Sequence, residues 1–299
     1  MAYAALFESI LEPEIEDAEE ETFWLYSQPI PSSNLGFVDP KASTVDARVG
    51  GVDYTIHQSP GVLSSDRAGG TTGAVLWKIS PVFADWLSSP TNFLFASSPP
   101  LLDAASAILE LGCGISPLNA FALAPRVASH TLTDQAYVQR LLQRTLDDNS
   151  SLLSPSSTSS SSSSSSSRRS KPKPGRRGTV SFETLDWETD ELPRGRAFDA
   201  VLACDCVYNY ALIPPLVQTC VDACRRRQRH EEEEGGGGEV AKRPSLCIVA
   251  QQLRNDDVFK SWLEAFVKEF RVWRVADDRL PETLRPSAGF VIHVGILRE

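Results

Sequence analysis

Apolar and polar residues follow two different periods along this 299-residue chain, and together they predict a succession of strands and helices. Short apolar runs bounded by turn residues are typical of buried strands, whereas apolar residues at every third or fourth position are typical of helices. The strand pattern occurs at 107–111, 129–133, 179–185, 198–204, 245–251, 270–275 and 290–297. The helix pattern occurs at 117–124, 135–147, 211–225 and 256–269.

The alternation of these elements predicts an α/β fold with a doubly wound, largely parallel sheet of seven strands. No helix pattern separates the last two strands, so we expect the final strand, 290–297, to enter the sheet antiparallel. Upstream, residues 22–98 contain a strand pattern at 52–57 and a helix pattern from about 79 to 87. We expect this N-terminal portion to pack over the mouth of a site formed at the carboxyl ends of the strands.

Three segments depart from the alternating pattern. Residues 1–21 carry eight acidic and no basic side chains, and we expect an acidic flexible tail. Residues 150–178 include nine consecutive serines followed by a basic tract, a composition that predicts disorder. Residues 225–243 contain a glutamate run and then a glycine run, and we expect a flexible hairpin there. The remainder of 99–299 is predicted to form one domain that the two inserts interrupt.

The chain's most informative motif is Glu-Leu-Gly-Cys-Gly-Ile-Ser-Pro-Leu at 110–118, between a predicted strand and a predicted helix. Glycines at 112 and 114 would let the backbone lie against a ligand, while Ser116 can cap the helix and Pro117 fits its first turn. A nicotinamide or flavin fingerprint needs a third glycine where Pro117 stands. The acidic Glu110 at the head of the motif instead favours S-adenosylmethionine, with its carboxylate near the cationic methionine end of that cofactor.

Composition indicates the class of protein, the kind of partner and the cellular location that we expect. The 41% content of hydrophobic residues suits a globular core, and no apolar run approaches the roughly 18 residues that a membrane span needs. The formal net charge of −10 is unevenly distributed, and the mildly acidic remainder of the chain suits either a basic protein substrate or an ordinary protein surface. It disfavours bare nucleic acid, so no direct nucleic-acid site is expected. Six scattered cysteines suit a reducing compartment, and without the order of a signal peptide the expected location is cytoplasmic.

Acidic and aromatic residues follow the next predicted strands. Asp134 can accept hydrogen bonds from both hydroxyls of a ribose, or it can cap the helix that follows. Trp187 can stack on an adenine, or it can belong to the core. Asp205 can orient an incoming amine and Tyr208 can wall its channel, although Asp205 can equally cap a turn.

Two of these motifs together resemble the Asp-x-x-Tyr group of seven-strand protein-lysine methyltransferases. They are Asp205-x-x-Tyr208 after a predicted strand and the glycine motif before it; the segment Thr-Gly-Ala-Val-Leu-Trp at 72–77 extends the resemblance. Within the group, the context of these motifs is most similar to fungal ribosomal lysine N-methyltransferases, the ribosomal lysine N-methyltransferase 5-like proteins. The resemblance implies a class I, Rossmann-like methyltransferase fold and S-adenosyl-L-methionine as cofactor.

Carried over residue by residue, the resemblance implies cofactor contacts for a set of strand-end and turn residues: Trp77, Glu110, Gly112, Cys113, Gly114, Asp134, Trp187 and Ala203. It implies catalytic roles for Asp205 and Tyr208 and a lysine of a 60S ribosomal protein as substrate. Two cysteine pairs, at 204 and 206 and at 220 and 224, have spacings that could hold zinc. We expect no metal, because the first pair stands at the strand end needed for substrate.

Two other functions stay open at this stage. The same fold could methylate another protein, a small-molecule amine or a nucleic acid, although the Asn/Asp-Pro-Pro-Tyr/Phe pattern of nucleic-acid amine methylases is absent here. The chain could also be a non-catalytic methyltransferase-like scaffold. Direct methyl transfer needs no covalent enzyme intermediate, so we expect the protein to position a neutral lysine amine and exclude water.

Overall fold

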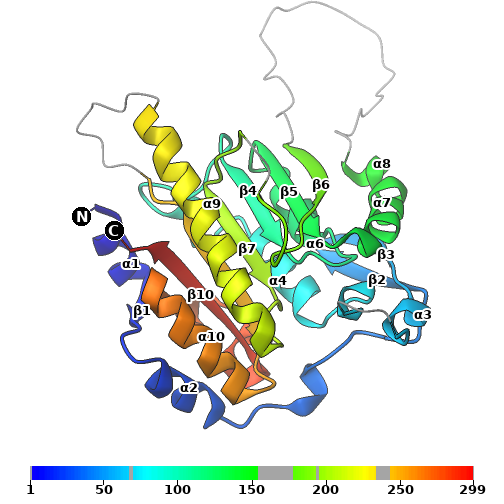
Figure 1. Ribbon diagram of the computed structural model, residues 1–299, viewed down its shortest axis with the longest axis horizontal. Helices are drawn as coiled ribbons and strands as arrows, with labels where there is room; N and C mark the ends of the chain where they lie inside the picture. The colour runs from blue at the N-terminus through cyan, green and yellow to red at the C-terminus, as the bar shows by residue number, and fades with distance from the viewer. Residues whose placement is uncertain (1, 67–69, 154–177, 193–194, 234–242, 299) are drawn as a thin grey trace, which may run out of the picture.

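The large sheet holds eight strands among the residues that the computed structural model describes, which are 2–66, 70–153, 178–192, 195–233 and 243–298 (Figure 1). In spatial order these strands are β1 (Leu11–Glu14), β9 (Phe270–Val275), β10 (Phe290–Leu297), β8 (Leu246–Gln252), β7 (Ala200–Cys204), β4 (Ala107–Leu111), β5 (Ser129–Asp134) and β6 (Thr179–Thr184). A separate antiparallel pair consists of β2 (Thr44–Val49) and β3 (Val52–His57). The predicted α/β, Rossmann-like fold is confirmed.

Strands β6, β5, β4, β7 and β8 run parallel, and β10 lies antiparallel between β8 and β9. The predicted antiparallel entry of the last strand is therefore confirmed. At the end of β4, Leu111 is level with Thr133 of β5 on one side and with Ala203 of β7 on the other. The chain visits β5 and β6 before it returns to β7, so β4 and β7 enclose the switch point where such sheets bind ligands.

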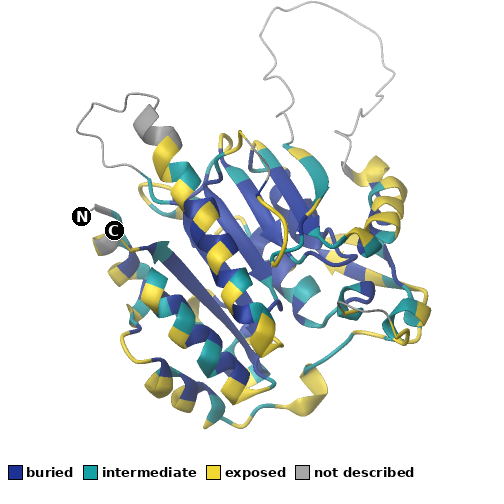
Figure 2. Cartoon of the chain, in the orientation of Figure 1, coloured by how far each residue is buried: buried dark blue, intermediate teal, exposed yellow. Residues whose placement is uncertain are grey.

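Both faces of the sheet are covered by helices, which explains the uninterrupted apolar runs in its strands (Figures 1 and 2). On β8, Ile248 packs in one buried cluster while its neighbour Val249 packs in the other. Helices α4 (Ile79–Ser88) and α6 (Leu118–Leu123) lie on the first face, and α9 (Ile213–Glu233) and α10 (Asp256–Glu269) lie on the second. The remaining helices are α1 (Ala2–Ile10), α2 (Ala18–Tyr26), α3 (Pro60–Leu63), α5 (Phe93–Ala96), α7 (Gln139–Asp148) and α8 (Ser150–Leu153).

Helix α10 illustrates how local sequence sets these boundaries. The side chain of Asn255 accepts a 2.9 Å hydrogen bond from the amide of Val258 and so caps the first turn. Two aspartates in the first turn and Lys268 in the last complement the helix dipole. Its buried face carries Trp262 and Phe266, whose rings stack at 5.1 Å. The predicted bounds of this helix, 256–269, are confirmed.

Residues 2–26 form regular elements, in contrast to the flexible acidic tail that the sequence predicted at 1–21. They form α1, β1 and α2, and β1 pairs with the edge strand β9 as an eighth strand. Phe7 stacks on Trp273 at 5.1 Å, and Leu25 is fully buried. The apolar residues spaced among the acidic ones are thus sufficient to pack this segment against the sheet. The carboxylates do not oppose this packing, because they face outward or pair with cations such as Arg274.

The structure describes only parts of the two segments, 150–178 and 225–243, that interrupt the predicted domain. Helix α9 continues to Glu233, so the first part of the expected flexible hairpin at 225–243 is helical, while 234–242 lie outside the described residues. Most of the expected disordered segment at 150–178, from 154 to 177, also lies outside them.

The predicted helix at 135–147 begins instead as a 3-10 turn, Ala136–Val138, before α7. Across the described part of the chain, no helix combines the length and apolar character needed to cross a membrane.

Candidate active site

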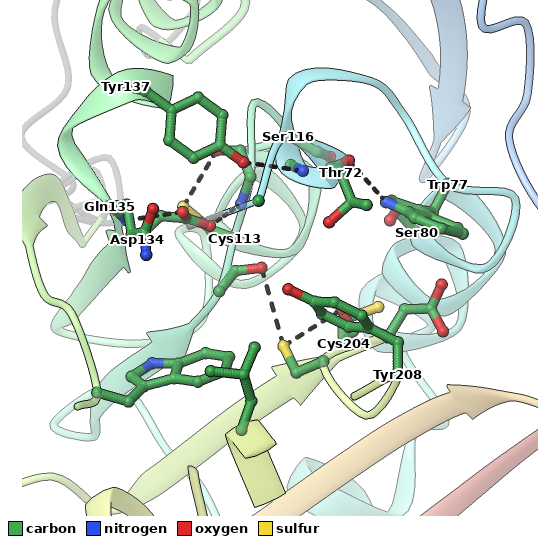
Figure 3. Close-up of a pocket in the computed structure, with 18 of the residues that line it drawn as sticks. Thr72, Trp77, Ser80, Cys113, Ser116, Asp134, Gln135, Tyr137, Cys204 and Tyr208 are labelled. Atoms are coloured by element: carbon green, nitrogen blue, oxygen red, sulfur yellow. Dashed lines mark hydrogen bonds between the residues drawn. The ribbon is translucent and has the colours of Figure 1, made fainter. Parts of the chain in front are cut away.

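A cavity with about 840 Å³ of unfilled space, part of it open to solvent, lies at the carboxyl ends of β4, β5 and β7. Its walls also include the segment before α4 and the loop after β6 (Figure 3). The structure brings eight of the ten residues singled out from the sequence to this cavity: Trp77, Gly112, Cys113, Gly114, Asp134, Trp187, Asp205 and Tyr208. Glu110 and Ala203 are not among the residues that line it.

The turn after β4 needs its glycines for a reason that the sequence did not reveal. Gly112 and Gly114 have φ angles of +65° and +58°, a region that strains any residue with a β-carbon. A β-carbon on Gly112 would lie 2.7 Å from the Cys206 sulfur, and one on Gly114 would lie 2.9 Å from the carbonyl oxygen of Gly73. Neighbouring protein atoms, rather than a ligand, therefore exclude side chains at these two positions.

The start of α6 also differs from the prediction. The helix begins at Leu118, and Pro117 stands at its N-cap without a side-chain hydrogen bond to the helix. Ser116, expected to be the cap, instead lines the cavity. A hydroxyl is therefore present on the cavity wall next to the glycine turn.

Asp134 connects the end of β5 to the glycine turn. Its Oδ2 atom accepts a 2.8 Å hydrogen bond from the amide of Gly114, and its Oδ1 atom accepts a 2.7 Å bond from the amide of Gln135. Asp134 is not the cap of the following helical segment, where Gln135 stands at the N-cap; its carboxylate lines the cavity, and the ribose role stays a prediction. A carboxylate oxygen can accept more than one hydrogen bond.

Residues 72–77 form a second wall of the cavity and pack against the turn. The carbonyl of Gly73 accepts a 3.0 Å hydrogen bond from the amide of Ile115, and its amide donates a 3.0 Å bond to the Tyr137 hydroxyl (Figure 3). The indole of Trp77 donates a 3.1 Å bond to the carbonyl of Thr72. Tyr137 was not identified from the sequence as a residue of the site. The available indication was that it follows Asp134 by three residues, immediately after a predicted strand.

The loop after β6 supplies an aromatic wall. Trp187 lines the cavity and packs so closely on the turn that a β-carbon on Gly112 would lie 3.0 Å from its ring. Beside it, Asp186 accepts a 3.1 Å hydrogen bond from the side chain of Gln135. An indole and a polar pair therefore share one side of the cavity, which suits a flat heteroaromatic ring with polar edges.

Asp205 ends β7 in an unusual backbone conformation and is already well bonded. Its φ is +60°, a left-handed value that Asp and Asn tolerate better than other residues with a β-carbon. Its side chain is 2% exposed and accepts hydrogen bonds from Arg254 Nη2 at 2.8 Å, from Gln252 Nε2 at 2.8 Å and from the Gln252 amide at 3.3 Å. Burial raises the pKa of Asp205 to about 6, against the opposing effects of Arg254 and Gln252. Neither neighbour was anticipated from the sequence.

Tyr208 stands at the mouth of the cavity, where it is 41% exposed. Its partial burial raises the pKa of its hydroxyl, and a hydrogen bond with the Thr72 side chain opposes that rise. The hydroxyl therefore stays protonated at neutral pH. A ring in this position can contact both a molecule inside the cavity and a chain lying across its opening.

Three thiols contribute to the wall: Cys113, Cys204 and Cys206. Burial raises the pKa of each well above its ordinary value, so all three are neutral at pH 7. Neutral buried thiols are poor nucleophiles and poor metal ligands. Within the described ranges, no three His, Cys, Asp or Glu side chains are grouped so that they could hold a metal ion.

Glu110 points beneath the turn rather than into the cavity. Its carboxylate is 2% exposed, accepts a 2.8 Å hydrogen bond from Asn119 and lies 2.8 Å from His130 Nε2. Side chains alternate along a strand, and this one faces α6. Ala203 is likewise buried, against the opposite helical layer. Neither side chain lines the cavity, and cofactor contacts at these two positions stay a prediction.

A family model described as "Lysine methyltransferase" matches residues 170–229, the stretch that contains Trp187, Asp205 and Tyr208. The chain is 27% identical over 253 residues to ribosomal lysine N-methyltransferase 5 of Zygosaccharomyces rouxii, covering 77% of this chain and 76% of that protein. It is also 26% identical over 273 residues to diaminohydroxyphosphoribosylamino-pyrimidine deaminase of Schizosaccharomyces pombe, covering 90% of this chain. This chain spans only 56% of the length of that deaminase.

Among solved structures, the chain is similar to the apo form of the S-adenosylmethionine-dependent methyltransferase SibL. The TM-score is 0.42 at 16% sequence identity, covering 74% of this chain and 56% of that chain.

Proposed function

Since the chain belongs to the lysine methyltransferase family, with distant homology to fungal ribosomal lysine N-methyltransferase 5, we propose that it methylates a lysine of a 60S ribosomal protein in the cytoplasm. The family implies S-adenosylmethionine as co-substrate. The observation that carries the proposal is the convergence of the glycine turn, Asp134 and Asp205 on one cavity at three neighbouring strand ends. This edge of the sheet is the ligand site of doubly wound folds.

The cavity walls fit the parts of S-adenosylmethionine. Trp187 offers a face for the adenine, Asp134 offers carboxylate oxygens for the ribose hydroxyls, and the turn at Gly112, Cys113 and Gly114 offers its backbone beside them. Trp77 closes the other side. When bound, this co-substrate supplies a methyl group on a cationic sulfur, a good electrophile for an amine.

Asp205 is suited to orient the lysine amine. An ionised carboxylate has about four acceptor positions on its two oxygens. Three donors, one from Arg254 and two from Gln252, already bond to it, which leaves capacity for one more. A hydrogen bond from the amine would fix its direction, and the carboxylate charge would stabilise the positive charge that develops on nitrogen. The buried site keeps this interaction strong by excluding water.

The chain's own chemistry supports direct transfer. The wall thiols are held neutral, so no nucleophile competes with the lysine. Tyr208, at the mouth, can hold the aliphatic stem or the cationic form of the lysine against its ring. We also propose that residues 22–98 act as a cover for residues 99–299, since Thr72, Gly73 and Trp77 line the cavity.

Labelled-methyl transfer tests the proposal. The protein is incubated with methyl-labelled S-adenosylmethionine and fungal 60S subunits, and the labelled peptide is identified by mass spectrometry. We expect label on a lysine of one ribosomal protein, and calorimetry should detect cofactor binding. Label on RNA or on a small amine would reject the protein substrate, and absence of cofactor binding would favour a scaffold.

A matched pair of variants connects the activity to the site. Asp205→Asn keeps the left-handed backbone that Asn tolerates but removes the charge, and it should abolish transfer while cofactor affinity stays within about threefold. Glu188→Gln, at an exposed position on the loop after β6, is the control and should retain full turnover. Unchanged turnover in Asp205→Asn would reject the assigned role.

A further inference from the structure

Arg254 is not among the residues singled out from the sequence, and it contacts two of them, Asp205 and Trp77. It follows β8 and precedes the cap of α10, and its Nη2 atom is 2.8 Å from Asp205 Oδ1. Its guanidinium carbon lies 4.3 Å from the centre of the Trp77 ring. One cation therefore bridges the carboxylate at the end of β7 and the indole of Trp77.

The guanidinium is held in place from several directions. The amide of Arg254 donates a 3.0 Å hydrogen bond to the carbonyl of Gln252, which shapes the short turn after β8. Its side chain is 23% exposed and contacts the Trp77 ring, which in turn lies 4.2 Å from the ring of Phe37. A guanidinium keeps its charge at every accessible pH, so this position carries a permanent positive charge.

Gln252 fixes the other side of the carboxylate. Its side-chain amide donates to Asp205 at 2.8 Å and to the carbonyl of Gly36 at 3.3 Å, and its oxygen accepts from the amide of Gly36 at 2.6 Å. Gln252 is neutral and cannot offset the cost of burying a charge at Asp205. Of the side chains that bond to this carboxylate, Arg254 alone brings an opposite charge.

The other titratable neighbours of Asp205 do not favour its ionised form. Cys204 and Cys206 flank it in sequence and are neutral thiols, while Tyr208 is a neutral phenol. Glu110 and Asp134 interact electrostatically with Cys206, so the nearby acids add negative rather than positive potential. Buried carboxylates in such surroundings take up a proton unless a cation opposes it.

We propose that Arg254 is a positioning residue for methyl transfer, which keeps Asp205 ionised and fixes its orientation so that its remaining acceptor position receives the lysine amine. The relevance to catalysis rests on the proposed function, whereas the effect on Asp205 can be measured without turnover. An arginine is required rather than any polar residue, because only a charged, planar group both bonds the carboxylate and lies on the indole.

The experiment titrates the Asp205 carboxyl by ¹³C NMR in protein labelled at aspartate side-chain carbons, with Asp205→Asn assigning the signal. Arg254→Met should raise the apparent pKa of Asp205 by about one unit or more, and Arg254→Lys should restore part of that shift. Arg271→Met is the matched control, since Arg271 also contacts a carboxylate, Glu14, and a tryptophan, Trp273. It should leave the Asp205 titration unchanged.

Turnover gives the second measurement. At pH 7, Arg254→Met should lower kcat about tenfold or more with cofactor affinity unchanged, and raising the pH should recover part of the loss. An unchanged Asp205 titration in Arg254→Met would overturn the proposal. Faster turnover in this variant would also overturn it, by showing that the guanidinium competes with the amine. A wild-type protein without methyl transfer would reject the proposed function alone, because the titration still decides the effect of Arg254.

Discussion

Asp134 accepts a 2.8 Å hydrogen bond from the amide of Gly114, so the end of β5 holds the turn that follows β4. The same carboxylate lines the cavity and is the proposed ribose ligand. We expect Asp134→Ala to weaken S-adenosylmethionine binding by about ten- to a hundredfold, since hydrogen bonds to a charged group contribute about 1.5–3 kcal/mol. Calorimetry measures this, with the exposed Asp147→Ala as control. Equal affinities for the two variants would contradict the assignment.

Gly114→Ala should be costly for two reasons, a left-handed φ of +58° and a β-carbon 2.9 Å from the Gly73 carbonyl oxygen. We expect a loss of about 1–3 kcal/mol in the free energy of unfolding, measured by urea titration, together with weaker cofactor binding. Gly61→Ala is the matched control, because its β-carbon meets no atom within 4 Å. The control should be neutral or slightly stabilising. A harmless Gly114→Ala would show that the turn can move away from Gly73.

Substitution of Glu110 distinguishes a structural role of this side chain from a role in cofactor binding. Glu110→Ala would leave the buried donors of Asn119 and His130 without their acceptor, at a cost of about 2–4 kcal/mol in the free energy of unfolding. Cofactor affinity of the folded variant should stay within about threefold of wild type, because the side chain does not line the cavity. Urea unfolding and calorimetry measure the two effects separately. A large loss of cofactor affinity in folded Glu110→Ala would show that this side chain takes part in cofactor binding.

The pH dependence of transfer should report Asp205. Free lysine has a pKa near 10.4, so log(kcat/KM) should rise with a slope of about one between pH 7 and 9. Burial raises the pKa of Asp205 to about 6, and the role proposed for this carboxylate requires its ionised form. Below about pH 6 the slope should therefore steepen to about two. A slope that stays at one down to pH 5 would argue that Asp205 acts equally well when protonated.

The attachment of helix α2 should be sensitive to acid through Glu21. Burial tends to raise the pKa of Glu21, but His293, 3.2 Å away, and Arg274, 3.0 Å away, lower it below its ordinary value of 4.5. Its stabilising contribution is thus complete above pH 4.5 and is lost as the pH falls through the lower folded-state value.

Glu21→Gln should cost about 1–3 kcal/mol in the free energy of unfolding at pH 7, and this difference should shrink below pH 4. Urea titrations at both pH values measure it. Glu20→Gln, exposed on the same helix, should cost nothing measurable at either pH. A difference that stays constant with pH would show that Glu21 contributes through packing rather than charge.

The sequence by itself determined the sheet and its connecting helices. The predicted ranges for β4, β9, β10 and α10 agree with the structure at both ends, because strands and helices buried on a sheet's faces leave continuous or periodic apolar runs. It also located most of the cavity, since a glycine turn and acidic or aromatic residues immediately after strands all meet at one edge of a parallel sheet. The apolar patterns and the residues that follow each strand are local properties of the sequence, so they can be recognised without the tertiary structure.

Only the tertiary structure decided which groups those residues contact. Nothing local connects Asp205 with Arg254, 49 positions away, or Gln252 with Gly36, 216 positions away. The direction of Glu110 was set by a helix packed beneath the turn, and the folding of residues 2–26 by apolar contacts with β9 and β10. A local pattern specifies which side of an element is buried, whereas the partner of a buried charge follows from packing between distant elements.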